Sequence, residues 1–301
     1  MELINIEGGR YFATVNLKRG ANCISLRDKK TGISILREPD YSLGVLDNPY
    51  LYGMPILFPV NRISGGSFEF EGRTYCFPIN EPATSCHLHG ELHCSEFELI
   101  ESSESRILCS YRAKTGEYLS FPHAFEIQME YSLDDSGLAH KTTVTNLSGE
   151  NMPCMLGFHT TFNAPKESRA FVDIAEEYRR NMKNYLPTGE KPEFDGVTNR
   201  LRSGEFSPFE AVISRHYRAG KTGLMSLDCS KFRIVYENDA KFTFRLIYNG
   251  QANEYICLEP QNCLANAPNA PFSREECGFD FIEPEKSKTY ISKIYVEEKS
   301  K

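Results

Sequence analysis

The sequence predicts an all-β protein built as one large antiparallel β-sandwich with very little helix. The first observation is a period-two alternation, clearest over residues 125–131, where every odd position is apolar and every even position is polar. The second is that helical periodicity is nearly absent. The chain of 301 residues can bury a large core, and no linker, repeat or low-complexity tract divides it. We therefore expect a single domain over residues 1–301, with two sheets packed face to face.

The expected strands run through the whole chain. In the first third, a turn at Glu71-Gly72-Arg73 separates two alternating segments, 67–70 and 74–77, which predicts a hairpin. In the last third, an alternating segment at 241–248 ends at the turn signal Asn249-Gly250. The remaining expected strands are 11–17, 22–27, 106–113, 140–146, 171–174, 232–237, 255–258 and 289–297.

Two other segments complete the secondary-structure prediction. Residues 164–210 are rich in proline, glycine and charge, which is typical of long loops around short strands. Residues 273–277 are expected to form a short helical turn. Helix is therefore a minor component of the predicted fold.

Composition and charge exclude several classes of partner. The chain has 41 acidic and 34 basic residues, a formal charge of −7, and no basic run, so nucleic acid is not expected as a partner. No secretory signal or membrane-spanning apolar run is present in the sequence. The ten cysteines are scattered without a CxxC pair and are expected to be reduced and mostly buried. These features predict a cytoplasmic protein with no membrane partner.

The first polar cluster that interrupts the apolar strands is Asn61-Arg62, followed by Gly65-Gly66. The two glycines permit tight backbone geometry, and the arginine offers a rigid fork of hydrogen-bond donors. The alternative interpretation is a surface arginine beside a hairpin.

The second cluster contains three histidines, His87, His89 and His93, within seven residues. On a single strand they would share one face, and imidazole is a frequent metal ligand. A metal site is therefore one hypothesis, and a cupin-like metal-dependent isomerase is a distant alternative. Glu91 follows His89 too early, and Glu96 too late, for the cupin spacing.

Two further clusters point to acid–base chemistry. His159 lies among apolar and hydroxyl residues, and Glu259 follows an apolar strand and precedes Pro260. A carboxylate inside a sandwich must be paired or hydrogen-bonded, or its pKa rises. A tuned carboxylate and a neutral histidine are the usual pair for general acid–base catalysis. For His159 alone, a hydrogen-bonded core histidine is the simpler interpretation.

Taken in order, these clusters resemble the aldose 1-epimerase (galactose mutarotase) family. Each motif is short, but their order from about residue 55 to residue 270 makes the resemblance specific. The matching pieces are Asn61-Arg62-Ile63 with Gly65 and Phe68, Gly72 and Tyr75, Asn80, Leu88-His89-Gly90, Gly157-Phe158-His159-Thr160-Thr161-Phe162-Asn163, Pro187-Thr188-Gly189-Glu190, Ile256-Cys257-Leu258-Glu259-Pro260-Gln261 and Pro268-Asn269-Ala270.

The resemblance implies a galactose mutarotase-like supersandwich whose open cleft binds a monosaccharide, with no metal and no cofactor. It implies that Glu259 removes the proton of the C1 hydroxyl while His159 protonates the ring oxygen, so that the α and β anomers interconvert through the open chain. It also implies that His89, Arg62 and Asn61 bind the sugar. The family contains monomers and dimers, so either a monomer or a homodimer is compatible with it.

One position departs from the family pattern. Family members carry an Asp-His motif whose aspartate grips sugar hydroxyls, and the counterpart here, Ser214-Arg215-His216, has an arginine. We therefore expect Arg215 to bind the substrate and to favour an anionic or otherwise modified sugar. The gripping carboxylate could instead be Asp228 or Asp239.

Two function hypotheses remain open at the level of sequence. The first is an enzyme of the mutarotase type, favoured because both Glu259 and His159 are retained. The second is a non-catalytic carbohydrate-binding or sensing protein on the same fold, favoured by the altered aspartate motif. The absence of tryptophan argues for a compact monosaccharide pocket rather than a polysaccharide surface.

Overall fold

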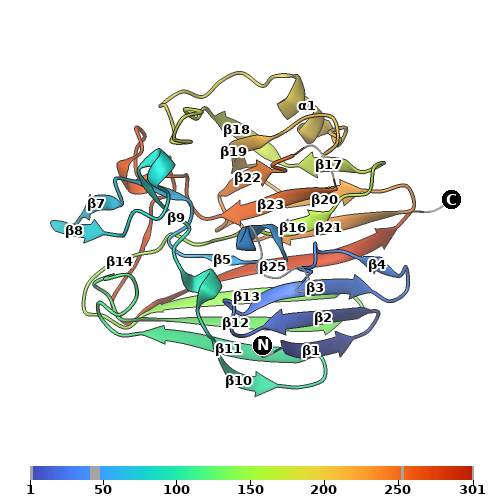
Figure 1. The fold of residues 1–301 in the computed structure, drawn as a ribbon, viewed down its shortest axis with the longest axis horizontal. Helices are drawn as coiled ribbons and strands as arrows, with labels where there is room; N and C mark the ends of the chain where they lie inside the picture. Colours follow the sequence, from blue (N-terminus) through green and yellow to red (C-terminus); the bar gives the residue numbers. More distant parts are fainter. Residues whose placement is uncertain (1–2, 41–47, 252–253, 300–301) are drawn as a thin grey trace.

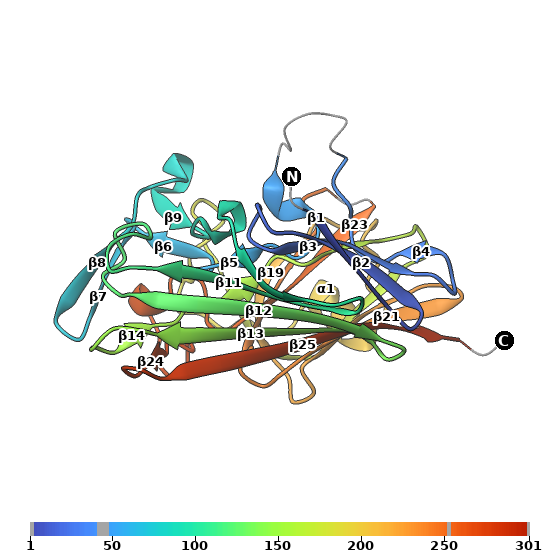
Figure 2. The ribbon, with the colours of Figure 1, turned by 90° about the horizontal axis from the view of Figure 1, so that it is seen from below.

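The structure is a computed structural model that describes residues 3–40, 48–251 and 254–299. It confirms the all-β fold class, because the described chain folds into two facing layers of antiparallel strands (Figure 1). Seen on edge in Figure 2, strands β12, β13 and β25 lie in one layer, and β3 and β5 lie in the other. The interior between the layers holds the hydrophobic core.

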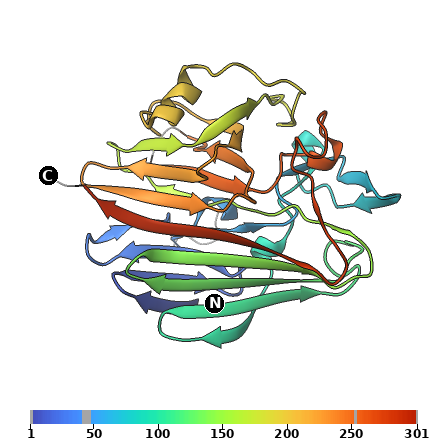
Figure 3. The same ribbon diagram turned by 180° about the vertical axis from the view of Figure 1, so that it is seen from behind.

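The first layer is one eight-stranded sheet. Figure 3 shows it from behind, with the red strand β25 between β13 and β21. In spatial order its strands are β10 (Glu98–Ser102), β11 (Arg106–Ala113), β12 (Phe125–Asp134), β13 (Gly137–Asn146), β25 (Ser287–Glu298), β21 (Phe232–Asn238), β20 (Leu224–Asp228) and β17 (Arg169–Val172).

The second layer is made of a four-stranded and a seven-stranded sheet. A bridge between Leu36 and Phe162 continues one sheet into the other. The four-stranded sheet contains β1 (Leu3–Gly8), β2 (Tyr11–Asn16), β3 (Asn22–Asp28) and β4 (Ile33–Ser34). The seven-stranded sheet contains β18 (Ile174–Tyr178), β19 (Ser214–Ala219), β22 (Phe244–Tyr248), β23 (Tyr255–Gln261), β15 (Gly157–Phe158) and β5 (Ile56–Leu57), with β16 (Thr161–Asn163) paired to β23.

Short strand pairs and 3₁₀ turns complete the described architecture. The expected hairpin is confirmed as β7 (Ser67–Phe70) and β8 (Arg73–Cys76). The other short pairs are β6 (Arg62–Ser64) with β9 (Cys86–Leu88), and β14 (Met152–Pro153) with β24 (Phe281–Ile282). The 3₁₀ turns are Pro49–Leu51, Pro82–Thr84, Leu92–Cys94 and Ala267–Asn269.

The alternation seen in the sequence positions the core. In β12 the buried residues are Phe125, Ile127, Met129, Tyr131 and Leu133, and the residues between them are more exposed. Because successive side chains of a strand point to opposite faces, one face of β12 packs on the second layer and the other faces solvent. The prediction for this strand is confirmed.

Strand β22 departs from the predicted pattern. The sequence places polar residues such as Arg245 on a solvent face, but Arg245 is fully buried. Its guanidinium donates hydrogen bonds to the carbonyl oxygens of Phe242, Phe244 and Gly223. Backbone acceptors inside the sandwich therefore satisfy a charge that alternation alone assigns to solvent.

The helix prediction needs correction. Residues 164–210 contain an α-helix, α1 (Gly196–Ser203), where only loops and short strands are expected. The expected turn at residues 273–277 is present, closed by a hydrogen bond from the Cys277 N–H to the Ser273 carbonyl oxygen at 3.0 Å. Asp195 caps α1 by accepting hydrogen bonds from the backbone N–H groups of Val197 and Thr198, and Gly204 ends it in a left-handed conformation. Figure 1 shows α1 at the edge of the molecule, beside β17 and β18.

The ten cysteines are all free thiols, and eight of them are buried, as the sequence predicts. Burial raises the pKa of most of these thiols, for example that of Cys23 to about 12, which keeps them protonated at neutral pH. Within the described residues, no helix has the length and apolar character needed to span a bilayer.

Candidate active site

A cavity of about 460 Å³ lies over the outward face of β22 and β23 and collects most of the predicted site residues. Its volume falls in the range of small-molecule sites. His89, His159 and Glu259 line it, together with Asn61 and Arg62. The structure therefore brings together residues that are separated by up to 198 positions in the sequence.

Strand register explains why Glu259 faces this cavity. In β23, Cys257, Glu259 and Gln261 alternate with Ile256 and Leu258, so the two sets point to opposite faces. The apolar set faces the core between the layers. Because β23 is buried on both faces, its sequence shows a continuous apolar run broken only by the residues that face the cavity.

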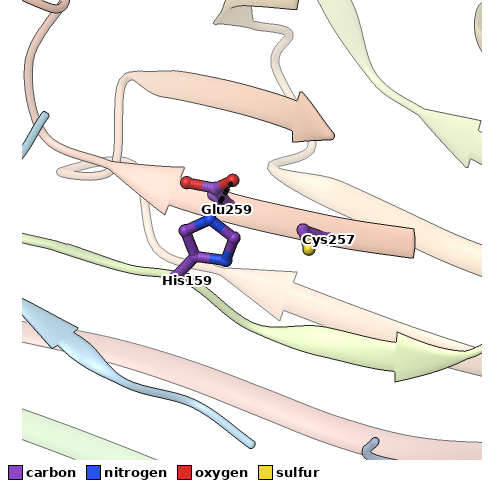
Figure 4. Close-up of side chains that lie close together, drawn as sticks. All are labelled: His159, Cys257 and Glu259. Carbon is purple, nitrogen blue, oxygen red and sulfur yellow. Dashed lines mark ion pairs between the residues drawn. The ribbon is translucent and has the colours of Figure 1, made fainter. Parts of the chain in front are cut away.

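His159 and Glu259 are in direct contact. His159 Nε2 lies 3.2 Å from Glu259 Oε1, and both side chains are buried. Figure 4 shows the imidazole pointing at the carboxylate from the segment that passes beside β23. The contact is not aligned as a hydrogen bond, so Oε1 has no hydrogen-bond partner among the described residues. An unsatisfied buried oxygen of this kind is available to a ligand.

Burial shifts the pKa values of this pair towards the neutral forms. It raises the pKa of Glu259 well above its ordinary value, and it lowers the pKa of His159 to about 4. The cause in both cases is the loss of hydration of the charged form. Burial therefore favours the protonated carboxyl of Glu259 and the neutral imidazole of His159.

Two amides fix the orientation of Glu259. Asn61 Nδ2 donates to Gln261 Oε1 at 3.2 Å, and Gln261 Nε2 donates to Glu259 Oε2 at 3.2 Å. Asn61 Oδ1 accepts the backbone N–H of Arg62 at 2.9 Å. Each polar atom of the Asn61 side chain therefore has one partner within the protein and keeps a second N–H or lone pair. Asn61 supports Glu259 through Gln261 and also lines the cavity, so its role in sugar binding stays a prediction.

His89 presents one ring nitrogen to the cavity. Its Nδ1 accepts the backbone N–H of Asn61 at 3.3 Å, which leaves Nε2 as the protonated donor of a neutral ring. Burial, followed by the neighbouring His159, lowers the pKa of His89 well below its ordinary value. His89 is therefore a neutral hydrogen-bond donor at the cavity.

The backbone around His89 is tightly constrained. His89 and Gly90 both have positive φ angles, 64° and 65°, so β9 ends before His89 and the three histidines do not share one strand face. A Cβ at Gly90 would lie 1.8 Å from the carbonyl oxygen of Phe58, so only glycine fits there.

Arg62 lines the cavity, and its positive charge is balanced by the carboxylate of Glu81. Its Nε and Nη2 donate to the two carboxylate oxygens of Glu81, each at 2.6 Å. The guanidinium also lies 4.6 Å from the ring centroid of Tyr185. A bidentate pair of this kind holds the arginine in one orientation.

Tyrosines form the aromatic wall. Tyr50 packs against His89 and His159, with ring centroids 4.9 and 5.9 Å apart, and Tyr248 lies on the other side of His159 at 6.1 Å. Together with Tyr185 they line the cavity. A pyranose has one apolar face, which tyrosine rings suit while their hydroxyls stay near water.

The expectation for Arg215 needs correction, because this residue does not line the cavity. Arg215 pairs across the sheet with Ile247, whereas Ser214 and His216 alternate with it and face the other way. Its guanidinium binds Asp195 at 2.7 Å and Glu177 at 3.3 Å, beside α1. Arg215 is therefore held by two carboxylates outside the cavity. The alternatives Asp228 and Asp239 also lie outside the cavity.

One group of described residues has the geometry to hold a metal ion. Single ligand atoms of His159, Cys257 and Glu259 all lie within 4.8 Å of one another (Figure 4). This group includes the contacting pair His159 and Glu259 and differs from the histidine set that the sequence suggested. His87 Nδ1 instead contacts the carbonyl oxygen of Pro78 at 2.7 Å, and the His93 ring packs on Tyr50. The histidine cluster is therefore not gathered into a metal site.

Sequence reasoning missed Arg180, Tyr185 and Gln261. Gln261 had a usable signal, because it stands two residues after Glu259 on the same strand and must share its face. No sequence signal identifies Arg180, because it lies in the stretch 164–210, where no periodicity indicates which way its side chain points. Ser214, Tyr248 and Tyr50 were also not assigned to the site.

A second cavity of about 490 Å³ carries charged residues but lacks this chemistry. Lys288 is paired with Asp280 there, and Lys241 with Asp239. None of the described buried atoms that lack a hydrogen-bond partner belongs to its lining. We therefore place the candidate active site at His159 and Glu259.

Comparison with known proteins shows which fold and which family the chain shares. The chain is 25% identical to the uncharacterized protein YphB of Escherichia coli K12 over 252 residues, which cover 81% of this chain and 83% of YphB. A galactose mutarotase-like protein from Clostridium acetobutylicum superposes with a TM-score of 0.92 at 28% identity, covering 99% of this chain and 95% of the other. The GalM/aldose epimerase homologue from C. elegans superposes with a TM-score of 0.80 at 15% identity, covering 99% of both chains.

The profile of one protein family also matches most of the sequence. The family is described as aldose 1-epimerase, and the match extends over residues 2–276. It includes every residue of the cavity described above, from Asn48 to Glu259. The chain therefore belongs to the aldose 1-epimerase family.

Proposed function

We propose that this protein is an isomerase that interconverts the α and β anomers of a monosaccharide, with Glu259 and His159 as its acid–base pair. The observation that carries the proposal is the 3.2 Å approach of His159 Nε2 to Glu259 Oε1 inside a cavity of small-molecule size. Membership of the aldose 1-epimerase family supports the same reaction.

The chemistry needs one base and one acid close together. Ring opening removes the proton of the C1 hydroxyl and adds a proton to the ring oxygen. The bond between C1 and the ring oxygen breaks, its electron pair stays on that oxygen, and C1 becomes a carbonyl carbon. Rotation about C1–C2 and closure on the other face give the second anomer. Both oxygens are bonded to C1, so Glu259 and His159 can reach them from adjacent positions.

The reaction needs one transferable proton in the pair, on His159, with Glu259 ionised. Burial favours the same proton on Glu259, so in this proposal it moves across the 3.2 Å contact to His159 before the ring opens. Glu259 then accepts from the hydroxyl while His159 donates to the ring oxygen, and closure reverses both transfers. Protons and electrons balance without an oxidant or a reductant. The raised pKa of Glu259 makes it a stronger base than an exposed carboxylate.

The other cavity residues hold the sugar in this proposal. His89 donates from Nε2 to the ring oxygen or a neighbouring hydroxyl, and Arg62 donates from Nη1, the guanidinium nitrogen that does not bind Glu81. Asn61 and Gln261 keep Glu259 oriented. We also propose a cytoplasmic location, which the free thiols of all ten cysteines support.

Magnetisation exchange between anomers, measured by NMR on a panel of neutral and anionic sugars, tests the proposal. We expect at least one sugar to exchange faster than in buffer. Glu259→Gln and His159→Asn should each lower that enzymatic rate by about 10²–10⁴-fold, because each removes one proton-transfer group. Glu297→Gln, an exposed carboxylate on β25 (Ser287–Glu298), is the matched control and should keep the full rate.

The competing hypothesis is a non-catalytic carbohydrate-binding protein on the same fold. It predicts sugar binding without accelerated exchange, and an unchanged rate in Glu259→Gln. Either result would overturn the catalytic proposal.

A further inference from the structure

A second arginine lines the same cavity and is not used by the reaction described above. Arg180 follows β18 (Ile174–Tyr178), and only 8% of its surface is exposed. Its Nη2 donates to the carbonyl oxygen of Ser214 and to the Ser214 hydroxyl, at 2.8 Å for the hydroxyl. No described residue accepts a hydrogen bond from its Nε or Nη1. The side chain is therefore anchored through Nη2, and the N–H groups of Nε and Nη1 remain available to a ligand.

Arg180 also differs from its neighbours in charge balance. Arg62 is neutralised by Glu81, and Arg215 by Asp195 and Glu177. No described carboxylate forms an ion pair with Arg180. A buried guanidinium without a counter-charge is unfavourable, so its retention beside a cavity points to a ligand that supplies the charge.

A second cation, Arg62, lies near Arg180 and adds to the positive charge at the cavity. The guanidinium of Arg180 lies 5.7 Å from the ring centroid of Tyr185, and that of Arg62 lies 4.6 Å from the same centroid. The two cations therefore share one aromatic wall. Burial, and then Arg62, lower the pKa of Arg180 to about 10, so it stays charged at neutral pH. Glu259 is the carboxylate on the cavity floor, and burial favours its neutral form.

We propose that Arg180 is the recognition residue for an anionic group of the substrate, so that the sugar is an aldose carrying a phosphate or a carboxylate. This inference rests on the proposed function, since the same cavity must hold the reacting carbon. The shared chemistry is an oxyanion on a reducing sugar, which a guanidinium binds through charge-assisted hydrogen bonds. The role that the sequence assigned to Arg215 falls to Arg180.

A second explanation for Arg180 is that it stabilises the ionised form of Glu259 from a distance. That explanation predicts equal losses for neutral and anionic sugars when Arg180 is replaced. Anion recognition predicts a selective loss. Comparing matched sugars therefore separates the two roles.

The experiment measures anomer exchange with glucose, glucose 6-phosphate and glucuronate in the wild type and in Arg180→Met and Arg180→Lys. We expect the wild type to prefer at least one anionic sugar over glucose. Arg180→Met should lower kcat/KM for that sugar by about 10- to 100-fold, the loss typical of a hydrogen bond to a charged group, and change the value for glucose by less than about threefold. Arg180→Lys should restore part of the preference because it keeps the charge.

Two controls are needed. One checks that the variants fold, and the other tests anion binding even if the protein is not a catalyst. Thermal unfolding checks that the variants fold, and Arg233→Met, an exposed arginine on β21 (Phe232–Asn238), should behave as the wild type. Calorimetric titration with the same three sugars measures binding without turnover. Tighter binding of an anionic sugar that disappears in Arg180→Met supports the inference even if no exchange is seen.

Three results would overturn the inference. They are equal losses for glucose and for the anionic sugars in Arg180→Met, a wild-type preference for glucose, and no binding of either anionic sugar. Comparison of glucose 6-phosphate with glucuronate then identifies which oxyanion the cavity accepts.

Discussion

The two layers of the sandwich treat buried polar groups in opposite ways. In the eight-stranded layer, β12 buries only apolar or satisfied side chains, and the Tyr131 hydroxyl donates to the carbonyl oxygen of Ala21 at 2.9 Å. In the seven-stranded sheet, every residue of β23 is buried, including Glu259 and Gln261. Unpartnered atoms of His159, His216 and Glu259 belong to this second layer or its adjoining segment.

This difference in buried polar groups indicates that the eight-stranded layer stabilises the fold, whereas the cavity residues of the seven-stranded sheet destabilise it. Apolar burial in the eight-stranded layer stabilises the fold. The polar floor of the cavity is destabilising until a ligand satisfies it, since unpaired buried groups cost free energy. Substitutions in the two layers should therefore have opposite effects on stability and on activity.

The largest effect on stability is expected from a core substitution in the eight-stranded layer. Met129→Ala removes a fully buried side chain of β12 and should lower the free energy of unfolding by about 2–5 kcal/mol. Anomer exchange per folded molecule should stay close to that of the wild type. Denaturant unfolding and NMR exchange measure the two quantities, and a folded but inactive variant would contradict the separation of the layers.

The next effect concerns the pH dependence of the reaction. In the proposed mechanism the pair of Glu259 and His159 carries one proton. Burial lowers the pKa of His159 to about 4, so a second proton is added, and kcat/KM should fall, only near that pH. An exposed histidine with a pKa of about 6.5 would instead leave roughly a tenth of the activity at pH 5.5. The profile of kcat/KM against pH reports the free enzyme. An acid limb near pH 6.5 would show that His159 is not buried as described.

The smallest effect is expected from Glu259→Gln on stability. The pKa of Glu259 is raised in the folded state, so its destabilising contribution is absent below the unfolded value of about 4.3 and grows as pH rises. The variant should therefore be as stable as the wild type at pH 4 and more stable, by about 0.5–2 kcal/mol, near pH 8. A lower free energy of unfolding at pH 8 would mean that the carboxylate stabilises the fold.

The strands, and the position of Glu259 within one of them, could be predicted from the sequence because they follow local rules. Period two identified residues 125–131 as a strand with an inward odd face. Glu259 was recognisable as a carboxylate inside an apolar strand. Helix α1 (Gly196–Ser203) was missed although Asp195 and Gly204 are typical cap residues, since its eight residues give a weak period.

The remaining site residues depend on tertiary geometry. Arg215 and His216 are neighbours in sequence but lie on opposite faces of β19, so a motif alignment could not decide which residue meets the cavity. Arg180 reaches the cavity from a segment without periodicity, and its lack of a counter-ion is visible only once Glu81, Asp195 and Glu177 are placed in space.

The amide pair formed by Asn61 and Gln261 has an evolutionary consequence. These residues orient the Glu259 carboxylate, whereas Arg180 and Ser214 line the cavity from other parts of the chain. Wall residues can therefore be exchanged by gene duplication or directed evolution while the reacting centre stays intact. A library randomised at the wall and fixed at Asn61 and Gln261 should yield enzymes that accept new sugars, because inherited reactivity and acquired selectivity are encoded by separate residues.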